Sequence, residues 1–156
     1  MTRDSEYIPS IAVAKFSGSF NRISPEEANE IFIKLLSEIS IECGNKGCSM
    51  IGHNKANFKC GDDFLSISCT TEDGNVRSKT LFREDVTDYI GVMNIIVYGL
   101  EYVTLREIIE SKSSAIDGCK VVVLKDKGCD DPECTDPNCT DEKHRRIINI
   151  EDSPII

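Results

Sequence analysis

Alternation of apolar and polar residues predicts six strands along the chain. Residues 11–20 alternate loosely, with Ile11, Val13 and Lys15 on one side of the strand. Turn-forming residues separate the later segments, and Glu72-Asp73-Gly74-Asn75 is typical of a β-hairpin. The predicted strands cover residues 11–20, 50–60, 64–71, 76–82, 119–125 and 146–151.

A helix start follows the first of these strands. Ser24 can accept a hydrogen bond from the backbone of Glu27, and Pro25 suits the first helical position. The following apolar residues recur at helical spacing: Ala28, Ile31, Phe32, Leu35, Leu36 and Ile39. We therefore predict an amphipathic helix from Ser24 to about residue 41, which Gly44 and Gly47 end.

Residues 83–100 allow two interpretations. Their apolar positions fall at helical spacing, which predicts a helix, but residues 92–98 could instead form a buried strand. Thr104 and Glu107 then form a second capping box, which predicts a short helix beginning there.

The resulting order, β-α-β-β-β-α-α-β-(Cys loop)-β, predicts an α+β fold with a mostly antiparallel sheet and two to three helices. Residues 1–10 are expected to form a flexible leader. Residues 11–125 and 145–156 would form a single domain, and residues 126–144 a metal-binding loop inserted between the last two strands, which can pair with each other.

Composition narrows the class of protein. The chain has 156 residues, of which 40% are hydrophobic, enough for a core that does not depend on a metal. A net charge of −9 argues against nucleic acid as a partner and favours proteins or cations. The longest apolar run, residues 89–100, is shorter than the ~20 residues of a membrane span. The N-terminal residues lack a signal-peptide pattern, so we expect a cytoplasmic location.

Four metal-ligating residues share a five-residue spacing: Cys129, Cys134, Cys139 and His144. An extended five-residue step spans about 17 Å, too far for ligands of one ion. Asp-Pro turns containing Pro132 and Pro137 can fold each step back. Zinc accepts three thiolates and an imidazole in a tetrahedron, so the sequence predicts a zinc site that organises residues 126–144.

Other chemistry stays open for this loop. An iron–sulfur cluster prefers four cysteines, and Cys119 could replace His144 as the fourth ligand. Free or redox-active thiols are a further alternative, whereas stable disulfides are disfavoured in a reducing compartment.

A fainter copy of the spacing occurs earlier, where Cys43, Cys48 and His53 are also five residues apart. Together with Cys60 and Cys119 they could form a second metal site or share one with the loop. The simpler interpretation is that cysteines at a helix end and on strands are ordinary core residues.

The sequence contains no phosphate-binding loop, dinucleotide motif or nucleophile elbow, and Cys48 with His53 is the one plausible Cys/His pair. We therefore expect a non-enzymatic accessory or regulatory protein that docks on a larger protein or enzyme complex. Its zinc loop would stabilise the contact or make it redox-sensitive. The alternative is an iron–sulfur or thiol-based redox protein of anaerobic metabolism. In composition alone, the chain resembles small cytosolic proteins of anaerobes, methanogenic archaea in particular. Its oligomeric state is not specified by these patterns.

Overall fold

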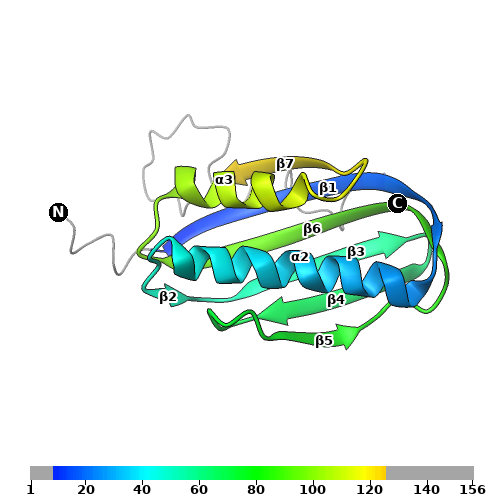
Figure 1. The fold of residues 1–156 in the computed structure, drawn as a ribbon, viewed down its shortest axis with the longest axis horizontal. Helices are drawn as coiled ribbons and strands as arrows, with labels where there is room; N and C mark the ends of the chain where they lie inside the picture. Colours follow the sequence, from blue (N-terminus) through cyan, green and yellow to red (C-terminus); the bar gives the residue numbers. More distant parts are fainter. Residues whose placement is uncertain (1–8, 126–156) are drawn as a thin grey trace, which may run out of the picture.

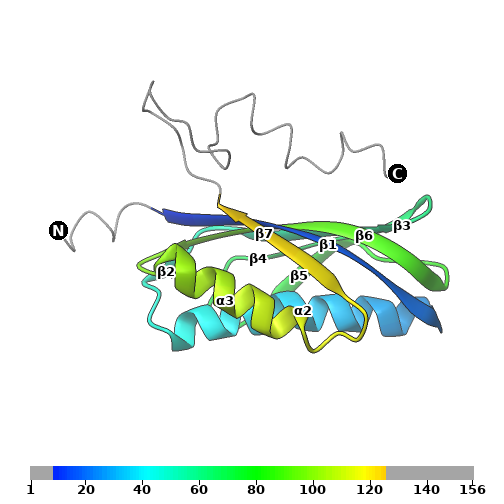
Figure 2. The same ribbon diagram turned by 90° about the horizontal axis from the view of Figure 1, so that it is seen from above.

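A computed structural model describes residues 9–125, which form one antiparallel sheet covered on one side by two helices (Figures 1 and 2). This confirms the predicted α+β class. The elements are β1 (Pro9–Ile23), α2 (Pro25–Asn45), β2 (Met50–Ile51), β3 (Asn54–Cys60), β4 (Asp63–Cys69), β5 (Val76–Thr80), β6 (Val86–Tyr98), α3 (Tyr102–Ser113) and β7 (Lys120–Lys125).

The strands follow the order β5-β4-β3-β6-β1-β7, and the short β2 also pairs with β6. β6 is central because β1, β2 and β3 all pair with it. Its register with β1 runs without interruption from Tyr98 opposite Pro9 to Asp88 opposite Ser19. An irregularity then bends the end of β1 toward α2, and Arg22 within it has a positive φ of 47°.

The predicted helix start is confirmed in α2. Ser24 Oγ accepts a hydrogen bond of 3.2 Å from the Glu27 backbone N–H, and Pro25 occupies the first helical position. The helix continues past residue 41 and through Gly44 to Asn45, and the chain turns at Gly47, where φ is +97°. Gly44 therefore does not end the helix as predicted, because glycine lowers helix stability without preventing the conformation.

The predicted helix over residues 83–100 is wrong, and the competing strand is correct. Tyr89, Met93 and Val97 do point to the same side, but they do so as alternate residues of β6. Apolar residues also occupy the opposite side of this central strand, including Ile90 and Val92. A strand apolar on both sides imitates helical spacing, which is why the two interpretations competed.

The second predicted capping box is also wrong. α3 begins at Tyr102 with Glu101 as its N-cap, and no side chain caps it. Gly99, at a φ of +80°, turns the chain out of β6, and the first helical bond runs from the Leu105 N–H to the Glu101 carbonyl. The turn after β6 therefore places the start of the helix upstream of Thr104.

The predicted strand 50–60 divides into β2 and β3, which pair with β6 on either side of Ile96. The intervening chain bulges, so Ile95 and Ile96 have no regular partner residue on β2 or β3, although both still pair with β1. The Gly52 N–H donates to the Ile96 carbonyl at 2.7 Å, and the Ile96 N–H donates to Asn54 Oδ1 at 3.0 Å. A buried side chain thus completes the interrupted ladder.

The main core lies between the sheet and the helices. Phe32 of α2 stacks on Phe58 of β3, with ring centroids 3.9 Å apart. Gly91 of β6 makes room for this stack, because a Cβ there would lie 2.3 Å from Phe58 Cδ1. Neither helix among residues 9–125 is long and apolar enough to cross a membrane.

Candidate functional site

The predicted zinc ligands Cys129, Cys134, Cys139 and His144 lie outside the described residues, as do the predicted strand 146–151 and most of the leader. What the structure does establish is the surroundings of the other five cysteines, all of which are free thiols.

The residues of the predicted second site occupy separate places in the fold. Cys43 is in the last turns of α2, Cys48 follows that helix, and exposed His53 separates β2 from β3. Cys60 ends β3, and Cys119 precedes β7. Among residues 9–125, no group of three or more His, Cys, Asp or Glu side chains could hold a metal ion. The described part of the chain therefore does not assemble this site by itself.

The way in which α2 ends explains the five-residue spacing of Cys43 and Cys48. The Cys48 N–H donates to the Cys43 carbonyl at 3.1 Å, and the Gly47 N–H donates to the Gly44 carbonyl at 3.0 Å. Together with the positive φ of Gly47, these two bonds define a Schellman motif. The motif characteristically brings two apolar residues five positions apart into contact. Cys43 and Cys48 occupy these positions and are both buried.

Burial also makes these two thiols poor ligands and nucleophiles. It raises the pKa of the Cys43 thiol from its ordinary 9.0 to about 12, with smaller contributions from Cys48 and Glu42. Burial, followed by the carboxylate of Glu72, raises the pKa of Cys48. Both are therefore protonated at neutral pH, whereas metal binding and nucleophilic attack require thiolates. Buried Cys48 and exposed His53 also give no sign of a catalytic pair.

Cys69 belongs to the core, and Cys60 and Cys119 pack against its margin. Burial raises the pKa of the Cys119 thiol, while its interaction with the Tyr89 hydroxyl partly offsets that effect. The Tyr89 hydroxyl is buried and makes no hydrogen bond of normal geometry to a described residue, so this thiol contact is a weak one. Cys119 is therefore already engaged by the body of the protein.

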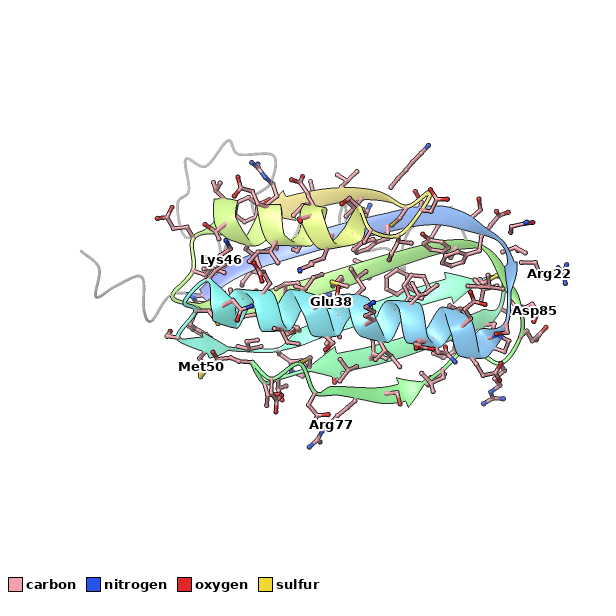
Figure 3. All side chains as sticks on the ribbon, in the orientation of Figure 1. Arg22, Glu38, Lys46, Met50, Arg77 and Asp85 are labelled. Carbon is pink, nitrogen blue, oxygen red and sulfur yellow. The ribbon has the colours of Figure 1, made fainter. Side chains whose placement is uncertain are left out.

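Two grooves flank the contact between α2 and α3. One, of about 630 Å³, lies between the C-terminal part of α2 and the α3 N-terminal region, where Glu42 and Lys46 face Glu107. The other, of about 400 Å³, has Ile31, Leu35 and Ile116 in its lining and charged residues such as Glu38 beside them. Figure 3 shows Glu38 midway along α2 and Lys46 at its end. Neither groove is lined by a histidine or cysteine.

The sheet face opposite the helices, which we call the outer face, is not covered by any described helix (Figure 2). Its apolar part lies on β7, β1 and β6. Val13 and Val92 form a small buried cluster there with Ile90, separate from the main core. Val122 of β7 remains 58% exposed beside them.

Apart from Phe64 of β4, the rest of the outer face is polar and basic. Strand alternation and register place the following residues on it: Lys15, Lys55, Lys59, Arg77 and Lys120. Arg77 is at the free edge of β5 (Figure 3). Among the strand residues of the described chain, Asp88 is the one acid on this face. The outer face is thus basic on a protein whose net charge is −9.

Comparison of the chain with protein-family models, curated proteins and solved structures gives no match. The function must therefore be inferred from the residues themselves.

Proposed function

We propose that this protein is a zinc-binding accessory protein that docks on a larger protein or enzyme complex. The observation that carries the proposal is that all five cysteines within residues 9–125 pack in or against the core. The chain has eight cysteines, and the other three are Cys129, Cys134 and Cys139. These three thiols are left for a metal, and His144 continues their five-residue spacing.

The chemistry of this set suits zinc. Three thiolates and one imidazole form a tetrahedral site, and the charge of zinc would offset the negative charge of the seven acids in residues 126–142, which disfavours thiolates. Residues 9–125 already have a continuous core on the helix side of the sheet. Loss of the metal would therefore change the loop and leave this core intact.

The position of Cys119 favours His144 as the fourth ligand. Cys119 precedes β7, whereas residue 126 leaves the opposite end of that strand. Six residues of strand separate these ends by about 20 Å. A cluster that used Cys119 would also have to withdraw its thiol from Tyr89. The contact with Tyr89 disfavours the four-cysteine set that an iron–sulfur cluster prefers, although the separation of about 20 Å is by itself within reach of the loop.

Two properties of residues 9–125 support docking on another protein. Residues 9–125 provide no catalytic Cys/His pair or metal group, but they do provide an outer face with exposed apolar and basic side chains. A bound ion that orders the adjacent loop could then strengthen or weaken a protein contact through the loop's shape.

The test is metal analysis with an absorption spectrum on the anaerobically purified full chain. We expect about one zinc per chain and a colourless protein. The variant C129S/C134S/C139S/H144A should lose the metal, whereas the matched control C60S/C119S should retain it. Retention of full metal content by the first variant would overturn the assignment, and absorbance near ~400 nm would favour an iron–sulfur cluster.

A further inference from the structure

Charge is distributed unevenly between the two sides of the sheet. α2 has five acidic residues and one lysine, Lys34, between Pro25 and Asn45. The outer face has four lysines and one arginine against Asp88. Such a face attracts an acidic ligand, although the whole protein would repel one.

The most acidic stretch of the same chain follows the outer face directly. Residues 126–142 contain seven acidic residues and one lysine. They come directly after β7, whose Leu124 and Val122 lie on the outer face beside Val13 and Lys15 of β1. We propose that the outer face binds this acidic cysteine segment, residues 126–142. The proposal goes beyond the proposed function, because it requires no metal.

The chain is long enough for this contact. Leu124, Val13, Asn94 and Lys55 are successive cross-strand neighbours on β7, β1, β6 and β3. Lys55 is therefore three strand spacings, about 14 Å, from the end of β7. Asp130, five residues beyond Lys125, can extend about 17 Å from it and so reach Lys55.

Lys59 is within reach of the later acids. It lies four residues along β3 from Lys55, about 13 Å. The diagonal from the end of β7 to Lys59 is then about 19 Å. Glu133 and Asp136 follow Lys125 by eight and eleven residues, so they span this distance without full extension. Lys55 and Lys59 can thus meet different carboxylates of one segment.

Exposed apolar surface and covalent attachment also favour residues 126–142 as the segment that binds the outer face. Val122 and Phe64 are 58% and 44% exposed on this face, so a segment crossing it would remove apolar surface from water. A covalently attached segment binds at an effective concentration of about millimolar, which a free acidic protein seldom reaches. A protein partner that uses this face would first have to displace the segment.

Zero-length carbodiimide cross-linking of the full-length protein tests this proposal. In the monomeric fraction, we expect peptides that join Lys55 or Lys59 to carboxylates of residues 126–142. Cross-links found only between two chains would assign the face to a second copy, and cross-links only to a co-purifying protein would assign it to a partner. Either result, or unlinked lysines on this face, would overturn the proposal.

Charge-reversal variants provide a second test of the proposed contact. In K55E/K59E, we expect cross-links from Lys120 to the segment to fall about tenfold, because two attractions become repulsions. The matched control K34E changes an exposed lysine on the helix side and should leave these cross-links unchanged. Circular dichroism should show both variants folded. An equal yield from K55E/K59E would contradict charge-directed binding. Zinc content is measured separately, so loss of the metal site would not be confused with loss of this contact.

Discussion

Substitution of Asn54 by alanine tests how the interrupted ladder of β6 is held together. Asn54 is fully buried, and its side chain connects three elements. Its Oδ1 accepts from the Ile96 backbone N–H at 3.0 Å, and its Nδ2 donates to Ser40 Oγ of α2 at 3.0 Å. Alanine removes both bonds.

The expected loss of stability is about 2–4 kcal/mol. Each buried polar group left without a partner costs about 1–3 kcal/mol. The Ile96 N–H bears most of this cost, because the bulge leaves no other described group to accept from it. The Ser40 hydroxyl is less costly, since a serine in a helix can donate to the carbonyl four residues earlier. Ser40→Ala instead leaves the buried Nδ2 of Asn54 without its acceptor and should cost about 1–3 kcal/mol.

Urea unfolding followed by circular dichroism measures these differences, and β3 supplies a matched control. Asn57 lies on the same strand but is exposed on the outer face. Asn57→Ala should change the free energy of unfolding by no more than about 0.5 kcal/mol. The double variant N54A/S40A should cost less than the two single variants together, because they share a bond.

Equal destabilisation by N54A and N57A would refute this account of the bulge. So would additive effects of N54A and S40A, since the shared hydrogen bond would then contribute nothing.

Three further predictions concern the core, the thiols and the metal. Gly91→Ala should destabilise the protein by about 1–3 kcal/mol in urea unfolding, because the added Cβ meets Phe58 at 2.3 Å; a neutral effect would contradict the close packing. Under native conditions at pH 7, iodoacetamide should label Cys43 at least about a thousandfold more slowly than a thiol of ordinary pKa 9.0, because its pKa is about 12. The thiolate fraction of Cys43 should keep increasing with pH up to about 12; equal labelling of all eight cysteines before unfolding would be incompatible with this. Removal of zinc by a chelator should leave the thermal midpoint of the body unchanged, and a large fall in that midpoint by circular dichroism would show that the core depends on the metal.

Local signals predicted α2 and its start, whereas partners distant in sequence decided the central strand. Ser24 and Pro25 act within one helical turn, so their effect is visible in the sequence. β6 is defined by pairing with β1 and β3 and by burial on both sides. Gly91 and the β-branched run that ends at Val97 were the available evidence for a strand. Helical spacing obscured that evidence.

The roles of the candidate site residues could likewise be predicted only in part from the sequence. The sequence correctly raised core packing as the simpler role of Cys43, but it gave no sign that Cys43 and Cys48 owe their spacing to a helix end. The motif depends on the positive φ of Gly47, which glycine permits but does not require. The role of Asn54 could not have been predicted, because its partners Ser40 and Ile96 come from other elements. The ligand assignment for Cys129, Cys134, Cys139 and His144 stays a prediction.

The pairing of β1 with β6 has a consequence for the order of folding. β1 begins the described chain and β6 follows it only after α2 and the strands β2 to β5, yet the two form the longest uninterrupted register in the sheet. The hairpins that join β3, β4 and β5 close short loops and can form early. β1 must instead wait until β6 has been synthesised, although it leaves the ribosome first. During translation, the apolar sides of β1 are thus the part of residues 9–125 most in need of protection.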